Sequence, residues 1–285
     1  MPAAADRRSY LERLGRRIDA VHSTLCLGID PVPEALPDGW PRDIRGVERF
    51  ANLLIDACLE RAAAVKVNLA FFEAFGSAGI AALERVRARV PSDVPFIADA
   101  KRADIGTTVA RQAVDIFDVL AADAVTANPY LGGEPLAPFL DRAATFVYVL
   151  CRTSNPGAAE FQNLDVNGEP LYVHVARRAA EWAQGRGNVG LVVASTAPAE
   201  LERIRATVPE MAALVVGVGA QAGDIAAVTR HGPATAGPAA GNSGGSLVTN
   251  VSRGIAAAAL GTAQPEVALA AAASRWADLL RTGPV

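Results

Sequence analysis

Cysteine and histidine are scarce in this chain of 285 residues, and their scarcity excludes several kinds of site. The three cysteines, Cys26, Cys58 and Cys151, are odd in number and far apart, so neither a disulfide framework nor a CxxC metal site is indicated. Only three histidines occur and no HExxH motif is present, which argues against a zinc centre. We therefore expect no bound metal, and three buried or unreactive thiols.

Long apolar runs and an excess of positive charge are also missing. The Ala-rich segment between about 255 and 274 is interrupted by Gly, Gln, Pro and Glu, so no stretch reaches the roughly 20 apolar residues of a membrane-spanning helix. Residues 1–23 carry charges throughout and lack the apolar core of a secretory signal, which makes the cytoplasm the expected location. The net charge of −3 argues against a general nucleic-acid or membrane-surface partner, because such binders are usually basic.

Short apolar runs recur along the chain, and each ends in a polar or glycine-containing turn before a stretch with helical periodicity. With 51% hydrophobic residues, the chain has enough apolar material for a large core. The runs predict eight strands, at 25–30, 64–69, 95–100, 124–129, 146–151, 189–195, 214–219 and 246–251.

Strands that alternate with helices predict a parallel sheet covered by helices, and eight such units predict a closed (β/α)8 TIM barrel. A doubly wound open sheet is the competing fold, but no GxGxxG follows the first strand. We predict one barrel domain over 1–285, with an N-terminal helical extension at 1–22. The segments 152–170 and 231–245, the second rich in Gly and Ala, are expected to be long loops, either active-site lids or plain connections.

Polar residues gather at the expected carboxyl ends of these strands, where barrel enzymes build their sites. For Asp30 before Pro31, and for Asn128 before Pro129, shaping a turn is an equally good explanation. The residues at these positions are Asp30, Lys66, Asn68, Asp99, Lys101, Asp104, Asn128, Ser154, Gln221 and Arg253.

The strongest signal is FIADAKRADIGTT at 96–108. Asp99 and Lys101 are two residues apart in an extended segment, so their side chains project to the same side, and Asp104 follows after a turn. Lys66, between Val65 and Val67, needs a charged partner if it faces the barrel interior. Together these residues predict a network of alternating charge, although a purely structural set of ion pairs is the competing interpretation.

The last two predicted strands end in glycine-containing turns that open helices, at 217–224 and at 252–254. Free backbone N–H groups in such turns bind phosphate, and Arg253 would add a fork of donors. Phosphate sites after the seventh and eighth strands recur in barrels of this kind. A phosphorylated substrate is therefore expected.

Seven segments of the chain match the motifs of a known family in order: LGIDP at 27–31, VKVNLAFFEAFG at 65–76, DAKRADIGTT at 99–108, TANPYLG at 126–132, TSNPGA at 153–158, GVGAQAGD at 217–224 and NVSRGI at 250–255. In these segments the chain resembles the orotidine 5′-phosphate decarboxylase family, in the branch with longer chains. The resemblance implies a cofactor-free enzyme that decarboxylates orotidine 5′-monophosphate to uridine 5′-monophosphate, the last step of de novo pyrimidine synthesis.

The resemblance also implies roles for individual residues. Lys101 would protonate C6 of the pyrimidine, with Asp99 against the departing carboxylate and Lys66 and Asp104 completing the network. Family members are homodimers, so Asp104, Ile105 and Thr108 would serve the partner's site. The implied substrate-binding set is Asp30 at the ribose, Ser154 at the pyrimidine, Gln221 between base and phosphate, Arg253 at the phosphate with Ser252 and Gly254, and in addition Asn68, Ile105, Thr108 and Asn128.

Two other functions remain open from the sequence. A metal-dependent sugar-phosphate lyase or decarboxylase of the same suprafamily would share the DxKxxD pattern, but such enzymes tend to place an acidic ligand where this chain has Lys66. A barrel that binds a nucleotide without catalysis is the second alternative, because a fold does not prove an activity.

Overall fold

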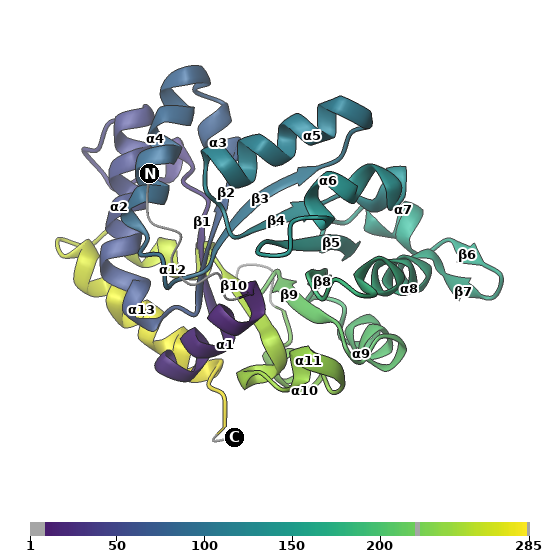
Figure 1. Ribbon diagram of the computed structural model, residues 1–285. Coiled ribbons are helices and arrows are strands. Elements are labelled where there is room, and N and C mark those ends of the chain that lie inside the picture. Colours follow the sequence, from purple (N-terminus) through teal and green to yellow (C-terminus); the bar gives the residue numbers. More distant parts are fainter. Residues whose placement is uncertain (1–8, 220–222, 284–285) are drawn as a thin grey trace.

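Eight parallel strands close into a barrel in a computed structural model of the chain, which describes residues 9–219 and 223–283. Hydrogen bonds join the strands in the order β1-β10-β9-β8-β5-β4-β3-β2 and back to β1 (Figure 1). The predicted (β/α)8 barrel is confirmed. Its strands are β1 Leu25–Ile29, β2 Ala64–Asn68, β3 Phe96–Arg102, β4 Ala124–Ala127, β5 Phe146–Arg152, β8 Val189–Ala194, β9 Ala212–Val216 and β10 Leu247–Val251.

Each predicted strand coincides with an observed one, and the largest difference is at β9. The strand begins at Ala212 and ends at Val216, whereas the sequence predicted 214–219. Gly217 and Gly219 have φ values of 87° and 90°, a conformation open to glycine that takes the chain out of the sheet. The apolar pattern continues into this turn, so it could not locate the strand's end.

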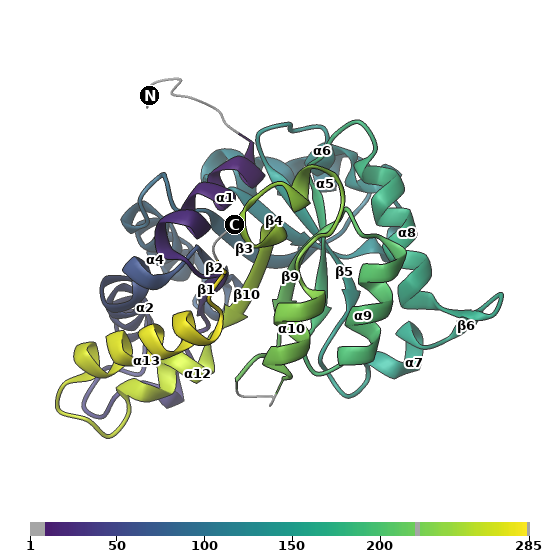
Figure 2. The same ribbon diagram turned by 90° about the horizontal axis from the view of Figure 1, so that it is seen from below.

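Helices surround the barrel and connect consecutive strands (Figures 1 and 2). In both views α2 and α13 lie side by side, and they are in contact. The helices are α1 Tyr10–Val21, α2 Ile44–Cys58, α3 Ala70–Glu73, α4 Gly76–Arg89, α5 Gly106–Val114, α6 Ala137–Leu140, α7 Ala158–Gln162, α8 Leu171–Ala183, α9 Pro198–Thr207, α10 Ile225–His231, α11 Gly237–Ala240, α12 Arg253–Ala256 and α13 Pro265–Leu279.

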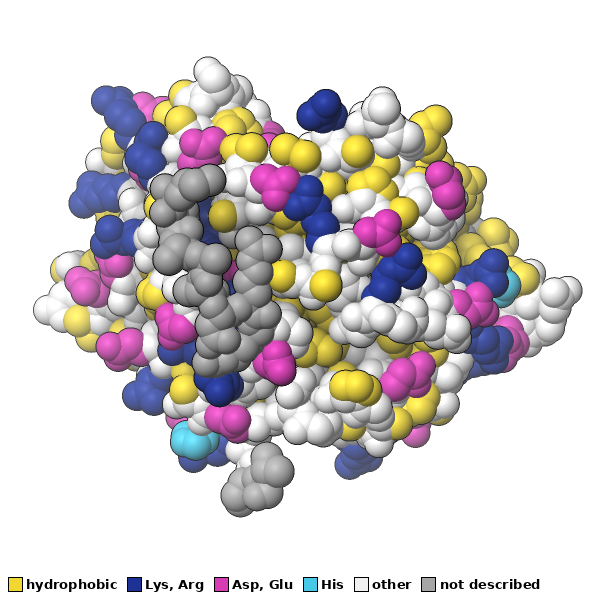
Figure 3. All heavy atoms as spheres, viewed as in Figure 1, with side chains coloured by type: hydrophobic (Ala, Val, Ile, Leu, Met, Phe, Trp, Pro, Cys, Tyr) yellow, Lys and Arg dark blue, Asp and Glu magenta, His cyan; other side chains and the backbone are white. Residues whose placement is uncertain are grey.

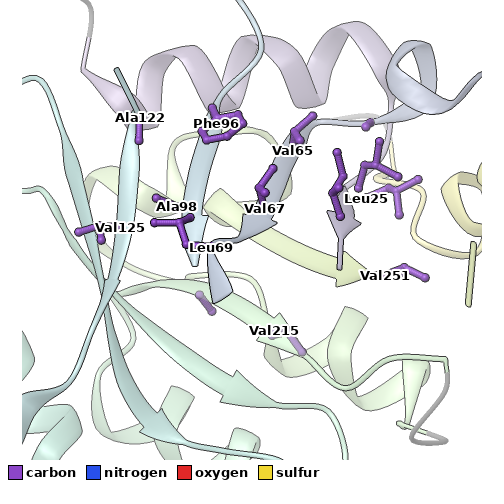
Figure 4. Close-up of a cluster of buried hydrophobic side chains, with 14 of the residues drawn as sticks. Leu25, Val65, Val67, Leu69, Phe96, Ala98, Ala122, Val125, Val215 and Val251 are labelled. Atoms are coloured by element: carbon purple, nitrogen blue, oxygen red, sulfur yellow. The ribbon is translucent and has the colours of Figure 1, made fainter. Parts of the chain in front are cut away.

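Two apolar layers result from the alternation of side chains along the strands. One set points outward and packs under the helices; Figure 4 shows Val65 and Val67 of β2 in this layer, with Phe96 of β3 nearby. The other set points into the barrel and includes Ile97 and Leu214. On β2, β3, β4 and β10 the inward positions nearer the carboxyl ends are polar, whereas β5, β8 and β9 present apolar side chains there.

The amino-terminal end of the barrel interior is filled by α1, the predicted N-terminal extension. Ser9 caps the start of this helix. Its side chain accepts a hydrogen bond from the backbone N–H of Glu12, and the Glu12 side chain accepts one from the backbone N–H of Ser9. The Tyr10 ring stacks on Phe146 at 4.7 Å between centroids, and its hydroxyl lies 3.1 Å from that of Tyr148. These side chains are buried together in one cluster and close the amino-terminal end of the barrel interior.

The segment 231–245 lies at this same amino-terminal end, so the possibility that it forms an active-site lid is wrong. It joins α10 to β10 and contains the short helix α11. Ala234 and Ala239 belong to the buried cluster that includes Tyr10. A connection from a helix to the next strand returns the chain to the strand's amino end, opposite the site.

The segment 152–170 is more regular than the predicted loop. It contains α7 and a hairpin of β6 Asp165–Val166 and β7 Glu169–Pro170, which extends from the barrel at the right of Figure 1. Asn167 and Gly168 form the turn, both at positive φ. Asn-Gly between short extended runs is a hairpin signal, and it is the feature from which this turn was predictable.

None of the helices in the described part of the chain combines the length and apolar character that crossing a membrane requires. On the face of the molecule seen in Figure 3, acidic and basic side chains are interspersed among apolar and polar ones. That distribution agrees with the small net charge of the chain.

Candidate active site

A cavity of about 560 Å³ opens at the carboxyl ends of the strands. This volume suits a small organic ligand. The cavity brings together residues of β2 and β3 with residues of the segments after β1, β5 and β10, which are distant in sequence. Eight of the residues expected in the site line it, namely Asp30, Lys66, Asn68, Asp99, Lys101, Ser154, Ser252 and Arg253.

The centre of the cavity is a chain of ion pairs on β2 and β3. Lys66 Nζ donates to Asp99 Oδ2 at 2.6 Å, and Lys101 Nζ donates to Asp99 Oδ1 at 2.7 Å. The Lys66 side chain is 3% exposed, whereas that of Lys101 is 50% exposed. Lys66 is thus fixed inside the barrel, and the Lys101 ammonium is presented to the open cavity.

The charges of this network stabilise one another. Burial alone would raise the pKa of the Asp99 carboxyl, but the ammonium groups of Lys66 and Lys101 outweigh burial and lower that pKa far below its ordinary value. Burial alone would lower the pKa of Lys66, but Asp99 and Asp30 outweigh it and raise that pKa. Asp99 and Lys66 therefore stay ionised at neutral pH, and removing either would leave the other charge buried without its main partner.

Among the described residues, two buried acceptors of the cavity have no hydrogen-bond partner, namely Asp30 Oδ1 on the β1 side and Asn250 Oδ1 on β10. The two strands are neighbours, and a Cβ added to Gly28 of β1 would lie 2.7 Å from Asn250 Oδ1. Glycine at this position therefore gives the amide its space. Orphaned acceptors are costly when buried, so both call for donors from a ligand, such as hydroxyl groups.

The part of the cavity formed by the turns after β9 and β10 has features that suit an anion. Gly217 and Val218 after β9 lie there with Ser252 and Arg253 after β10. Gly254 follows directly, and its carbonyl accepts a hydrogen bond from Trp276 Nε1 at 3.2 Å. Gln221, which was expected to bridge base and phosphate, lies outside the described residues.

Besides Gly254, four described residues of the predicted site do not line the cavity of this single chain. Asn128 is exposed, and its Oδ1 accepts from Tyr130 N at 3.0 Å, so the turn-shaping explanation describes its position here. Asp104, Ile105 and Thr108 lie at the start of α5, and Ile105 is 64% exposed. Thr108 is exposed as well, whereas Asp104 is half-buried and its Oδ1 accepts from Ile105 N at 2.8 Å.

Sequence reasoning missed further lining residues, namely Thr126, Thr153, Asn155, Gln162 and Asn250. Thr126 and Asn250 occupy inward positions two residues before Asn128 and Ser252, so the strand alternation was a signal that could have found them. Gln162 of α7 fixes the loop after β5, because its Oε1 accepts from Thr153 N at 2.9 Å and its Nε2 donates to Thr153 Oγ1 at 2.8 Å. No local pattern announced that contact.

Within residues 9–219 and 223–283, no three His, Cys, Asp or Glu side chains are grouped as metal ligands. Asp99, the most buried carboxylate of the cavity, is occupied by the two ammonium groups. The fold and the site together place the protein among the TIM-barrel enzymes, with a lysine–carboxylate centre at the carboxyl ends of its strands.

Comparison with known proteins identifies the family within this class. Residues 23–268 match the model of the orotidine 5′-phosphate decarboxylase / HUMPS family, and the chain belongs to that family. An orotidine 5′-phosphate decarboxylase of Thermomicrobium roseum is 48% identical over 219 residues, 76% of this chain and 78% of the relative. One of Herpetosiphon aurantiacus is 42% identical over 260 residues, 91% and 93% of the two chains.

Solved structures give the same result. The structure of an OMP decarboxylase of Leishmania donovani is similar with a TM-score of 0.79 and 36% sequence identity. The match covers 95% of this chain and 98% of that one. The resemblance seen in the motifs is therefore confirmed for both sequence and fold.

Proposed function

We propose that this protein decarboxylates orotidine 5′-monophosphate to uridine 5′-monophosphate, the last step of de novo UMP synthesis. The observation that carries the proposal is the Lys66–Asp99–Lys101 centre in a cavity of a chain whose curated relatives are named for this activity. The family name pairs orotidine 5′-phosphate decarboxylase with a second group, HUMPS, and relatives at 42% and 48% identity carry the name of the first.

The chemistry needs a stabilised anion and a proton donor. Loss of CO2 from C6 leaves an electron pair in the plane of the pyrimidine ring, where it is poorly delocalised. The Lys101 ammonium, half-exposed to the cavity, stabilises that charge and then protonates C6. Asp99 lies against the substrate carboxylate, and repulsion between two such charges about 4 Å apart amounts to about 4 kcal/mol at an effective dielectric constant near 20.

This reaction assigns no step to a metal or an organic cofactor. The new bond is C6–H, the broken bond joins C6 to the carboxylate carbon, and the proton comes from Lys101. Lys66 keeps Asp99 ionised and in place through a contact of 2.6 Å. The protein thus supplies a fixed arrangement of charge, which is the form of catalysis that requires the least reorganisation during reaction.

The remaining substrate groups are assigned along the cavity. The ribose hydroxyls would donate to Asp30 Oδ1, and its lack of a partner in the described part of the chain supports this assignment. Ser154 addresses the pyrimidine edge, and Arg253 with the backbone of Ser252 and Gly254 binds the phosphate. Gln221, Asn68 and Asn128 stay predictions as substrate contacts. The cytoplasmic location stays a prediction as well.

A homodimer with shared sites completes the network. Asp104, Ile105 and Thr108 lie outside the cavity of their own chain, and we propose that they enter the cavity of a second copy. The exposed apolar side chains beside them support this, because Ile105 after β3 is 64% exposed and Tyr130 after the neighbouring β4 is 82% exposed. Exposed apolar groups at neighbouring strand ends are typical of protein interfaces.

Shared sites predict that two inactive variants complement each other. In a mixed dimer of Lys101→Ala and Asp104→Ala subunits, one site combines an intact Lys101 with an intact Asp104. An equimolar mixture that exchanges freely should regain about a quarter of the wild-type activity, because half of the dimers are mixed and each has one intact site. Activity no higher than that of the separate variants, with exchange verified by mass spectrometry, would refute site sharing.

A direct assay tests the proposed function. Purified protein added to orotidine 5′-monophosphate should remove the ultraviolet absorbance of the orotate ring and yield one equivalent each of uridine 5′-monophosphate and CO2. We expect the rate to be unchanged after EDTA treatment, because the lysine centre repels a divalent cation. Binding of the nucleotide without turnover would support the non-catalytic alternative, and EDTA-sensitive activity would support the metal-dependent one.

A further inference from the structure

We propose that Thr126 is a positioning residue, which fixes the Asp99 carboxylate and the backbone of Lys101 together. The proposal rests on the proposed decarboxylase function. Thr126 lies on β4, next to β3, and is 1% exposed. Its side chain points inward and lines the cavity below the charged centre.

The Thr126 hydroxyl makes three hydrogen bonds, all to the neighbouring strand. It donates to Asp99 Oδ1 at 2.9 Å, and it accepts from the backbone N–H groups of Ala100 at 3.1 Å and Lys101 at 2.9 Å. A hydroxyl has one proton to donate and two lone pairs. All three are used within the protein, so Thr126 acts through Asp99 and Lys101 and makes no polar contact with the substrate.

The backbone that Thr126 holds is irregular. Ala98 of β3 pairs with Val125 of β4, but the next pair is Arg102 with Ala127, so β3 uses more residues than β4 over this interval. Lys101 has a φ of 48°, in the left-handed region that non-glycine residues rarely adopt. Such a conformation persists only where surrounding contacts hold it. The two N–H bonds to Thr126 are those contacts.

The same hydroxyl sets the orientation of the central carboxylate. Asp99 Oδ1 accepts from Thr126 and from Lys101 Nζ, while Oδ2 accepts from Lys66 Nζ. Two of these donors are at the ends of long side chains, whereas the Thr126 hydroxyl is attached close to a strand backbone. The short side chain is thus the rigid reference for both the carboxylate that faces the substrate and the residue that carries the proton.

Thr126→Val tests the proposal, since valine keeps the shape and removes the hydroxyl. We expect kcat for orotidine 5′-monophosphate to fall about 10- to 100-fold, because a displacement of about 1 Å between reacting groups costs on this order. The affinity for uridine 5′-monophosphate, measured by calorimetry, should stay within about threefold of wild type, because phosphate and ribose contacts are intact. Thr126→Ser, which restores the hydroxyl, should recover most of kcat.

Thr249→Val is the matched control. Thr249 is a fully buried threonine on β10 whose hydroxyl pairs with that of Thr24 at 3.2 Å, and it does not line the cavity. It should lose stability without a specific loss of kcat. If Thr126→Val cannot be isolated folded, Thr126→Ala carries the same expectation with a smaller side chain.

The outcomes separate this proposal from the function on which it rests. Wild-type protein that does not decarboxylate the nucleotide would overturn the proposed function, and the role of Thr126 with it. Active wild type together with an unimpaired Thr126→Val, an equal loss in Thr249→Val, or no recovery in Thr126→Ser would overturn the positioning role alone. If both Thr126→Val and Thr126→Ala fail to fold while Thr126→Ser folds, the residue serves folding and the proposal is wrong.

Discussion

Lys101→Ala should lower kcat for decarboxylation by about 10⁴-fold or more, because one group supplies both the proton and the charge that stabilises the carbanion. The variant should still fold, since the Lys101 side chain is 50% exposed and Asp99 keeps its pair with Lys66. Single-turnover measurements with saturating substrate would isolate this effect from binding. A kcat within tenfold of wild type would remove Lys101 from its assigned role.

The composition of the chain allows a sharp control for this prediction. Lys66 and Lys101 are the only lysines among its 27 basic residues, and the three native cysteines are buried. Lys101→Cys can therefore be alkylated selectively with 2-bromoethylamine, which restores an ammonium group at nearly the original length. Activity should return after alkylation, whereas Lys101→Arg should stay inactive because a guanidinium does not release its proton.

Arg253→Ala should chiefly weaken substrate capture. The apparent KM is expected to rise about 100-fold or more, because a charge-assisted contact with the phosphate is lost, while kcat at saturation changes much less. The variant should lose little on orotidine, which has no phosphate for Arg253 to bind. Arg281→Ala, at an exposed arginine paired with Asp278, is the matched control.

The contrast between the two variants tests the division of labour within the site. Binding energy from the distant phosphate is expected to act on capture and on closure of the cavity, and Lys101 on the chemical step. Comparable losses of kcat in folded Lys101→Ala and Arg253→Ala proteins would contradict this division. A loss of orotidine turnover in Arg253→Ala would also contradict this division, because orotidine has no phosphate for Arg253 to bind.

Local sequence pattern predicted most of the fold because strand alternation and helical periodicity are properties of neighbouring residues. It placed Asp99 and Lys101 on one side of an extended segment, and the structure joins them at 2.7 Å. It left two possibilities open for 231–245, an active-site lid or a plain connection. Composition does not tell which end of a barrel a connection occupies, whereas the direction of the strands does.

The sequence by itself determined the alternation of eight strands with helices, for which a closed barrel was the favoured fold, and the charged pattern of β2 and β3, because each depends on spacing along the chain. The tertiary structure decided which side chains on different strands are in contact. It decided that Lys66 reaches Asp99, that the Thr126 hydroxyl bonds to Asp99 and to the backbone of Lys101, and that Asn250 Oδ1 has no partner among the described residues. These relations follow from the register of parallel strands and the closure of the sheet, which bring distant residues within hydrogen-bonding distance and leave no local trace in sequence.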